Sequence, residues 1–571
     1  MNTAERFPVV LLWHMHQPDY RDAISGEYRL PWTLLHAIKD YTDMAAHLEA
    51  TPAARAVINF TPVLLEQLQE LAVSTRRHLQ SGAPLPDPVL AVLGTAALPV
   101  DPPRRLHLLN SCLRAHAVNL IARFPAYAEL ARLAREFMSE ATIVYASDQF
   151  LRDLGVWYYL AWLGETIKRK DQRVAALIAQ QRTFTAAHRR TLLELIAELL
   201  EGLLPRYRAL CASGQLEVAI SPYAHPILPL LLDFTVARES QPGVALPTAP
   251  GYPGGAARAD WHLQHAVRDL QKYFGVGPTG CWPSEGALSA AALDRIAGSG
   301  FQWIASGGAV LHGTLSQRPG DPGLLPESHV YAHASATGDT LNCVFRNDEL
   351  SDLIGFSYST WHGDDAVAHC VAEIERVSSA ARASSGKQRM LLIALDGENA
   401  WEHYPYNGFY FLQGLYAALA RHPRLQLCTM SECLRRIGSK DTVPLGRVRA
   451  GSWVHGTLAT WIGDADKNRG WDLLVAAKSA VDHALASGRY ADAERDRILK
   501  QLAHCESSDW FWWFGDYNPA ESVRDFDELF RHQLTNLYQL IGVAPPAALA
   551  GIISQGRGNP EGGGVMRRAD A

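Results

Sequence analysis

The chain has 571 residues, 48% of them hydrophobic and 20% charged, and a formal net charge of −6. A chain of this length can bury a large core and should form more than one domain. It offers no general basic field for nucleic acid, no apolar stretch near the roughly 20 residues that span a bilayer, and no signal-peptide pattern at its start. We therefore expect a cytoplasmic protein that has neither nucleic acid nor a membrane as a partner.

The eight cysteines are scattered along the chain and form no CxxC pair. Free, buried thiols in a reducing compartment are the expected state. The fifteen tryptophans are more informative, because they lie near polar motifs. Flat, rigid rings serve ligand binding as well as packing.

The first predicted strand covers Pro8 to Trp13 and ends at two histidines, His14 and His16. Alternate side chains of a strand point to the same face, and Pro18 then ends the ladder. The two rings could ligate a metal, form hydrogen bonds in a site, or be satisfied core residues. A zinc site needs at least three ligands with fixed supporting contacts, and no HExxH or CxxC completes one. Neutral site histidines are therefore favoured over a metal site.

The segment Ala56 to Leu68 predicts a second strand and the start of a helix, with Asn59 and Glu66 as polar candidates. From about residue 68 to residue 212, Leu, Ala, Arg and Glu recur at helical spacing, which indicates a long helical insertion. Its aromatic stretch, residues 148–162, is interpreted as a packed helix face.

A short strand, Leu216 to Ile220, follows the insertion. It is too short to stand alone, so we expect it to join the same sheet. His225 lies just beyond its end, again on the loop side.

The stretch Pro278 to Gly286 holds a carboxylate, Glu285, in a rigid turn beside Trp282. Pro283 limits regular structure there, and Gly286 permits close approach of the backbone. A glutamate near the N-terminus of the next helix is the plainer interpretation. A functional role for Glu285 is favoured because a second acidic residue, described below, also lies near a tryptophan at a strand end.

Three further predicted strands are Phe301 to Ala305, Leu341 to Phe345 and Gln426 to Met430. The second of them runs into Arg346, which could keep a catalytic carboxylate ionised by pairing with it. Strands separated by helical segments indicate βα units, and hence an α/β fold with a parallel barrel.

The chain is organised around the stretch Met390 to Tyr404. Its apolar start is typical of a strand buried on both faces, and it ends at Asp396, where barrel enzymes project catalytic side chains. Carboxylates, an amide and an aromatic ring follow: Glu398, Asn399, Trp401 and Glu402. This suits a carbohydrate site, because hydroxyls need bidentate acceptors and sugar faces need flat rings. An aspartate that caps a surface helix is the alternative, but a cap requires only one polar residue.

The residue pattern changes near residue 440, to a loop-like stretch that is followed by helices. Residues 1–440 are predicted to form the catalytic domain, with the helical insertion inside it, and residues 441–549 a C-terminal helical domain. Residues 550–571 are rich in Gly, Arg, Pro and Ala and have nothing to pack, so a disordered tail is expected.

A run of aromatic residues lies between two acidic residues, Asp509 and Asp516, within residues 507–518 of the C-terminal region. Their mixture suggests that one end of this segment faces a site. We expect at least one indole from the C-terminal domain, Trp461 or Trp510, to enter the active-site cleft.

Taken in order, five stretches resemble the five motifs of glycoside hydrolase family 57: His14–Pro18 with its HQP core, residues 214–229, Gly280–Glu285, Asp396–Glu402 and Trp453–Trp471. One such motif is weak, but five in the right order are specific, and the resemblance extends to about residue 545. The fifth has the form seen in the α-amylase and amylopullulanase branch. The third and fourth differ from those typical of branching enzymes, which disfavours that activity.

The resemblance implies a distorted (β/α)7 barrel with helical insertions and a C-terminal helical domain that closes the active site. It also implies retaining chemistry on α-glucans such as starch, glycogen or maltooligosaccharides, without a cofactor or an essential metal. Glu285 would be the nucleophile and Asp396 the general acid/base, so Asp396 needs a raised pKa and Glu285 an ordinary or lowered one. The implied substrate-binding residues are His14, His16, Glu217, His225, Trp282, Arg346, Glu398, Trp401, Trp461, Asp509 and Trp510.

Two other classes stay open at this point. A metal-dependent barrel hydrolase, such as a deacetylase or an amidohydrolase, would use His14, His16 and His225. A catalytically silent protein would bind glucans without turning them over. Hydrolysis and transglycosylation differ in whether water or a sugar reaches the intermediate, which loop shape and not sequence pattern decides.

Overall fold

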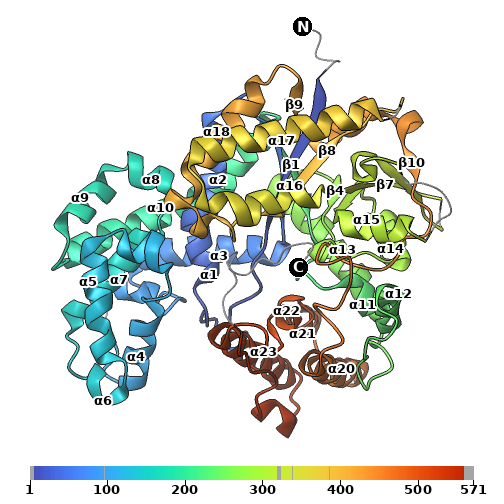
Figure 1. The fold of residues 1–571 in the computed structure, drawn as a ribbon. Helices are drawn as coiled ribbons and strands as arrows, with labels where there is room; N and C mark the ends of the chain where they lie inside the picture. The colour runs from blue at the N-terminus through green and yellow to red at the C-terminus, as the bar shows by residue number, and fades with distance from the viewer. Residues whose placement is uncertain (1–5, 95–96, 318–322, 337, 385, 559–571) are drawn as a thin grey trace.

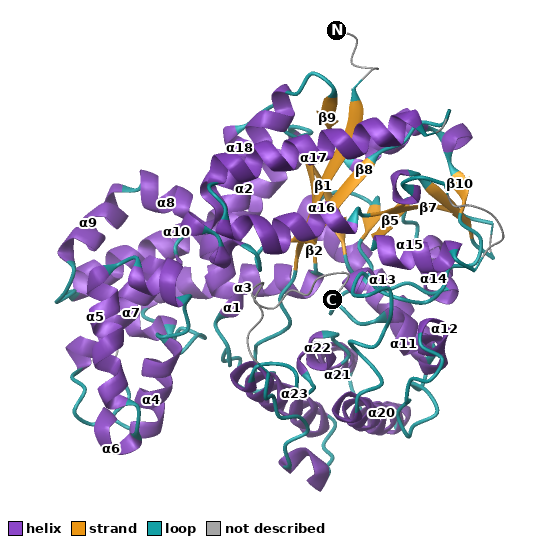
Figure 2. Cartoon of the chain, viewed as in Figure 1, coloured by secondary structure: helices purple, strands orange, loops and turns teal. Residues whose placement is uncertain are grey.

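The computed structural model describes residues 6–558, except 95–96, 318–322, 337 and 385 (Figure 1). Helices surround a curled sheet (Figure 2). Its strands are β1 (Phe7–Met15), β2 (Ala56–Phe60), β3 (Leu216–Ile220), β4 (Gly280–Cys281), β5 (Trp303–Ser306), β6 (Tyr331–Ala334), β7 (Thr340–Phe345), β8 (Leu391–Asp396), β9 (Leu425–Leu427) and β10 (Val443–Pro444).

Seven strands run parallel in the order β8, β1, β2, β3, β4, β5, β7. Beyond β7 the sheet continues through the antiparallel β6 to β10, and β9 pairs with the start of β1. The curl brings its two sides together: the backbone N–H of Asn347, just after β7, donates to Leu392 O of β8 at 2.9 Å. The predicted α/β fold, a distorted seven-stranded barrel, is confirmed.

The register of the central strands fixes where the polar residues meet. Every residue of β1 is buried, as its apolar run predicts. His14 near its end pairs in register with Asp396 of β8 on one side and with Asn59 of β2 on the other. Because parallel strands end at a common edge, residues that follow the apolar runs gather at one mouth of the barrel.

Strand β4 is short because a large side chain crosses it. A Cβ added at Gly280 would lie 2.0 Å from the indole of Trp303 in β5. Only glycine leaves room for that ring. The chain then leaves the sheet at Trp282 and turns towards the barrel mouth.

Helices α1 (Trp32–His36) and α2 (Thr42–Ala50) connect β1 to β2. The chain between β2 and β3 forms the helical insertion, on the left in Figure 1. Its helices are α3 (Pro62–Ser81), α4 (Pro102–Ser111), α5 (Pro125–Ala134), α6 (Glu140–Ile143), α7 (Asp148–Trp162), α8 (Glu165–Lys170), α9 (Gln172–Gln180) and α10 (Ala186–Ala212). Ser147 caps α7 by accepting from the Phe150 N–H. The aromatic side of α7, with Trp157 and Trp162, is buried, as a packed helix face requires.

The remaining helices of residues 1–440 follow the strands. They are α11 (Leu228–Leu232), α12 (Ala237–Ser240), α13 (Gly255–Phe274), α14 (Ala290–Gly298), α15 (Gly308–Leu315), α16 (Asp348–Asp352), α17 (Gly363–Ala383), α18 (Phe409–Arg421) and α19 (Met430–Ile437). Helices α17 and α18 pack on each other.

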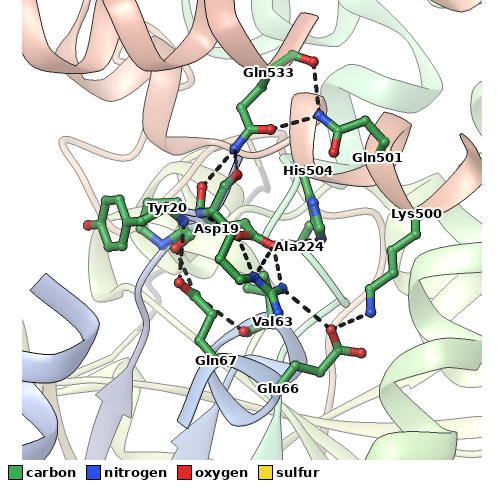
Figure 3. A network of polar contacts seen from close by, with 12 residues as sticks. Asp19, Tyr20, Val63, Glu66, Gln67, Ala224, Lys500, Gln501, His504 and Gln533 are labelled. Carbon is green, nitrogen blue, oxygen red and sulfur yellow. Dashed lines mark hydrogen bonds and ion pairs between the residues drawn. The ribbon is translucent and has the colours of Figure 1, made fainter. Parts of the chain in front are cut away.

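The C-terminal region is helical, with α20 (Ala465–Ala486), α21 (Asp492–Cys505), α22 (Asp509–Trp513) and α23 (Ala520–Leu540). A network of polar contacts joins it to the barrel (Figure 3). Lys500 Nζ lies 2.6 Å from Glu66 Oε2, and His504 Nε2 lies 3.2 Å from Asp19 Oδ2. Gln533 Nε2 also donates to Asp19 O at 3.0 Å. These contacts dock α21 on α3 and on the loop after β1, and α23 on the same loop.

The expected loss of structure from residue 550 onward is wrong for residues 550–558. The Ile553 and Ser554 N–H groups donate to Asp527 Oδ1 at 2.8 and 3.0 Å, and both residues are buried. The carboxylate of α23 thus supplies the packing partner that the sequence did not reveal. Residues 559–571 lie outside the described part of the chain. No helix among the described residues is both long and apolar enough to cross a membrane.

Candidate active site

A cavity of about 550 Å³ opens at the carboxyl ends of the barrel strands. Three parts of the chain line it. The barrel contributes His14, His16, Glu285, Arg346, Asp396 and Glu398; the insertion contributes Arg114, His116 and Trp162; the C-terminal region contributes Trp453, Asp509, Trp512, Trp513 and Asp525. Both predicted catalytic carboxylates therefore face the same space.

His14 is held by the neighbouring strand. The Asn59 amide nitrogen, in the orientation that satisfies its hydrogen bonds, faces His14 Nδ1 at 2.6 Å and also donates to Ser221 Oγ. His14 Nδ1 is then an acceptor, so Nε2 carries the proton. Nε2 is buried and has no protein partner among the described residues, which leaves this N–H available to a ligand.

Three histidine rings form a stack, and two of them, His14 and His16, line the cavity. His16 and His225 lie 3.9 Å apart between ring centroids, and His14 lies 4.9 Å from His225. Burial, and then the neighbouring His16, lower the pKa of His14 to about 3. The pKa of His225 is lowered well below its ordinary value for the same reasons. Both rings are therefore neutral hydrogen-bonding groups at neutral pH.

The stack also connects the barrel to the C-terminal region. His16 Nε2 lies 2.8 Å from Asp509 Oδ2, and His225 Nδ1 lies 2.9 Å from Ser508 Oγ. His225 Nδ1 is 3.8 Å from Glu285 Oε1. One stack of rings thus touches the loop before α22 and one of the two carboxylates.

Glu285 is aimed by an unusual backbone conformation. Its φ of 58° and ψ of 24° lie in the left-handed region, in the turn that Pro283 opens. Trp453 holds the residue twice: its backbone N–H donates to Glu285 O at 3.1 Å, and its indole Nε1 donates to Oε2 at 2.9 Å. A donor-only partner favours the ionised carboxylate.

Asp396 ends β8 and accepts from Asn399 Nδ2 at 2.8 Å. Glu398, two residues later, is buried and accepts the backbone N–H of His16 at 3.0 Å and Gln17 Nε2 at 3.4 Å. Asp396 and Glu398 thus tie the end of β8 to the end of β1.

Arg346 follows β7 and lies over the Trp453 ring at 4.8 Å. Its Nε donates to Asp348 Oδ1 at 2.7 Å and its Nη1 to Ala394 O at 3.1 Å. The suggestion that Arg346 pairs directly with a catalytic carboxylate is therefore corrected: its close ion partner is Asp348. Its charge still acts on Asp396 from a distance and lowers the pKa of that carboxyl.

Burial raises the pKa of both carboxylates. For Glu285 the charge of Asp396 adds to burial and the Trp453 hydrogen bond opposes them, so the pKa lies well above its ordinary value. For Asp396 burial outweighs the Asn399 hydrogen bond and the charges of His16 and Arg346. The expected ordinary or lowered pKa of Glu285 is thus wrong, because desolvation of its half-buried carboxyl and the nearby charge of Asp396 both favour the protonated form.

The family model for glycosyl hydrolase family 57 matches residues 10–446, which is more than half of the chain. The chain belongs to glycosyl hydrolase family 57. A search of curated proteins found no match.

Solved structures of family 57 enzymes share the fold. A branching enzyme from Thermococcus kodakaraensis aligns with a TM-score of 0.57 and 13% identity over 94% of this chain and 90% of that one. A branching enzyme from Pyrococcus horikoshii gives 0.56 and 14% over 98% of both chains. The α-amylase AmyC from Thermotoga maritima gives 0.55 and 12% over 94% and 93%. At these identities the likeness shows the fold alone.

Besides Trp461 and Trp510, four residues that the family resemblance implied as sugar ligands lie outside the cavity lining: Glu217, His225, Trp282 and Trp401. Glu217, early in β3, accepts from Trp303 Nε1 at 2.8 Å and Ser431 N at 2.7 Å. Trp282 is fully buried, with its ring centroid 4.9 Å from that of Trp453. Trp401 is buried and donates to Gly397 O at 2.9 Å, which supports the turn after β8.

The indoles expected from the C-terminal domain were the wrong ones. Trp461 and Trp510 are completely buried, and neither lines the cavity. Trp512 and Trp513 line it instead, and Trp461 packs behind Trp512 with ring centroids 6.0 Å apart. Residues at successive positions of a helix point about 100° apart. The run of aromatic residues therefore indicated which segment lies at the cavity, but not which face of the helix points into it.

The insertion supplies lining residues that sequence reasoning missed, namely Arg114, His116 and Trp162. Arg114 Nη1 lies 2.6 Å from Asp525 Oδ2 of α23, so the insertion and the C-terminal region meet at the cavity wall. No local motif marks these residues. The contact depends on how two distant helical parts pack.

One cluster among the described residues has a composition that could hold a metal ion: His16, His225 and Asp509, with ligand atoms within 4.8 Å of one another. The two rings stack with planes only 27° apart. A metal lies in the plane of each imidazole that binds it, and stacked rings direct their lone pairs side by side. His16 Nε2 also already lies against Asp509. The cluster therefore fits a hydrogen-bonding wall better than a zinc site.

Proposed function

We propose that this family 57 protein is a retaining enzyme that cleaves or transfers α-glucans, with Glu285 as nucleophile and Asp396 as general acid/base. The observation that carries the proposal is a pair of half-buried carboxyls, Glu285 and Asp396, that face one cavity at the barrel mouth and act on each other electrostatically. The structural relatives include branching enzymes and an α-amylase, whose substrates are α-glucans.

The first step follows from the contacts of the two carboxyls. Asp396 donates its proton to the glycosidic oxygen while Glu285 attacks the anomeric carbon, so that the C–O bond to the leaving sugar breaks and a glycosyl ester forms. The Trp453 indole N–H stabilises the Glu285 carboxylate before the attack. In the second step Asp396 takes a proton from water or from a sugar hydroxyl, which attacks the anomeric carbon and releases Glu285.

The raised pKa values of Glu285 and Asp396 fit a pair of carboxyls that shares one proton. Two half-buried carboxyls that face one cavity hold one proton more easily than two negative charges. The Trp453 indole N–H favours the charge on Glu285, as the Asn399 amide does on Asp396, and the mechanism requires the shared proton to lie on Asp396 when the glucan binds. The neutral His14 Nε2–H offers a donor to a sugar hydroxyl.

Product analysis with maltoheptaose tests the proposal. Glucose and maltose would indicate hydrolysis, and a ladder of longer chains would indicate transfer. Trapping with an activated fluoro-sugar should add one glycosyl group to the protein at Glu285, as peptide mass spectrometry reads it. No labelled peptide and no turnover of any α-glucan would overturn the proposal.

A metal-dependent hydrolase remains the second candidate, because His16, His225 and Asp509 lie close together. That candidate predicts stoichiometric zinc in the purified protein and activity that a chelator removes. The carboxylate mechanism predicts glucan turnover that survives chelation.

A further inference from the structure

The loop between α21 and α22, with the first residue of α22, carries the residues that meet the histidine stack. Ser508 at the end of this loop contacts His225, and Asp509, the first residue of α22, contacts His16. Glu506, which opens the same loop, is completely buried. Its carboxylate contacts a part of the barrel that does not line the cavity.

Glu506 is held by side chains that precede or belong to α13. Arg258 binds it through two nitrogens, Nε to Oε1 at 2.8 Å and Nη2 to Oε2 at 2.7 Å. Tyr252 OH donates to Oε1 at 2.6 Å, and His262 Nε2 lies 2.8 Å from Oε2. All three partners are themselves buried. Both oxygens of the carboxylate are therefore fixed in direction.

His262 links this cluster to the loop that carries His225. The Ala224 N–H donates to His262 Nδ1 at 3.3 Å, so the Nε2 proton of the ring faces Glu506. The Tyr223 N–H donates to His262 O at 3.2 Å. His225 follows with a φ of 60°, a conformation that persists only where its surroundings impose it.

The two loops then meet directly beside the carboxylates. The Ser508 N–H donates to His225 O at 3.0 Å, in addition to the contact between Ser508 Oγ and the His225 ring. Ser507 Oγ donates to Asp509 Oδ2 at 2.5 Å, the same oxygen that meets His16. A shift of Glu506 would therefore be passed to both His225 and His16.

Helix α21 has contacts to the preceding parts of the chain besides those of Glu506, namely from Lys500 to Glu66 and from His504 to Asp19 (Figure 3). The cluster around Glu506 is a separate set of contacts at the end of that helix. Its distinct consequence is the placement of the next three residues.

We propose that Glu506, fixed by Arg258, His262 and Tyr252, is a positioning residue that sets Asp509 against His16 and Ser508 against His225. The proposal deepens the proposed function and rests on it. Glu506 touches no cavity-lining carboxylate itself, so it acts through the loop.

Two variants of different severity test this role. Glu506→Gln leaves Arg258 charged without its partner, and Tyr252→Phe removes only one hydrogen bond from the same carboxylate. We expect kcat on maltoheptaose to fall about 10- to 100-fold in Glu506→Gln, the scale of an ångström-sized misplacement, with a smaller fall in Tyr252→Phe. KM should change far less than kcat in both.

Glu165→Gln is the matched control. Glu165 is a buried carboxylate held by two arginines, Arg123 and Arg169, and it lies outside the cavity lining. It should lose thermal stability to a similar degree as Glu506→Gln and retain the kcat of the parent below its melting temperature. If Glu165→Gln lost as much kcat as Glu506→Gln, the effect of Glu506→Gln would be explained by general destabilisation, and the proposal would be overturned.

Crystal structures of the two variants give a readout that does not depend on activity. The distances from Asp509 Oδ2 to His16 Nε2 and from Ser508 Oγ to His225 Nδ1 should lengthen in Glu506→Gln. Unchanged distances would overturn the proposal, whatever happens to kcat, and so would lengthened distances with an unchanged kcat. If the parent protein turns over no α-glucan, the proposed function fails, and the two distances still decide whether Glu506 positions the loop.

Discussion

The two sides of the cavity are held in place by different means. Asp396 and His14 are fixed by the hydrogen-bond register between β8 and β1. Asp509, Trp512 and Trp513 lie in the short helix α22, which side-chain contacts hold against the barrel. The strand side resists displacement because many backbone hydrogen bonds would have to break together, whereas the helical side depends on a few charged and polar pairs.

The nucleophile on the strand side should give the largest effect. Glu285→Gln removes the attacking oxygen, so kcat should fall by at least about 10³-fold, the range seen when a catalytic group is removed and positioning remains. Calorimetry should show maltoheptaose binding retained. An active Glu285→Gln enzyme would show that Glu285 is not the nucleophile and would remove the basis of the comparison.

Asp396→Asn should follow in size. General acid catalysis contributes about 10²- to 10⁴-fold, so the loss should be large for natural glucans and small for substrates with a good leaving group. Azide should partly restore turnover of an activated substrate, because it attacks the glycosyl ester without base assistance. The azide adduct is identified by mass. Equal losses on good and poor leaving groups would contradict the acid/base role.

Asp509→Asn tests the helical side and its effect on pH dependence. The charge of Asp509 raises the pKa values of both Glu285 and Asp396. Removing that charge lowers the pKa of Asp396, so the acid loses its proton at lower pH and the alkaline limb of kcat/KM should move downward in pH. We also expect kcat to fall about tenfold through the lost contact with His16. An alkaline limb that stays in place or moves upward would contradict the electrostatic link.

Trp512→Ala should have a smaller effect, mainly on binding. The indole lines the cavity, and its loss should raise the KM for maltoheptaose several-fold with a modest change in kcat. Trp361 offers a matched control, since it is a tryptophan 41% exposed and outside the cavity lining. Similar KM values for Trp512→Ala and Trp361→Ala would show that Trp512 holds no sugar.

The acid stability of the helical side should show the smallest difference. Burial of Glu506 opposes ionisation, but Arg258 and His262 outweigh it and hold the pKa at about 2, below the ordinary value of 4.5. A depressed carboxyl pKa stabilises the fold above pH 4.5, and the stabilisation is lost as the pH falls towards 2. The melting temperature should therefore decline less steeply between pH 4.5 and 2 in Glu506→Gln. Parallel curves for the parent and the variant would contradict this assignment.

The sequence by itself determined the strand side. The apolar runs that became β1 and β8 are local patterns, and a carboxylate or histidine directly after such a run must lie at the strand end, because side-chain direction follows from the backbone period. The turn at Glu285 could also be foreseen from its proline and glycine. The five motifs in order then indicated the family and the seven-stranded barrel.

Only the tertiary structure decided the helical side. Trp461 and Trp510 were chosen over Trp512 and Trp513 because composition does not reveal which face of a short helix meets the barrel. Arg114 reaches the cavity only because the insertion packs beside α23. The pKa of Glu285 likewise depends on burial and on the charge of Asp396, two residues that are more than a hundred positions apart in the chain. Such contacts are set by the packing of distant segments, which no local pattern encodes.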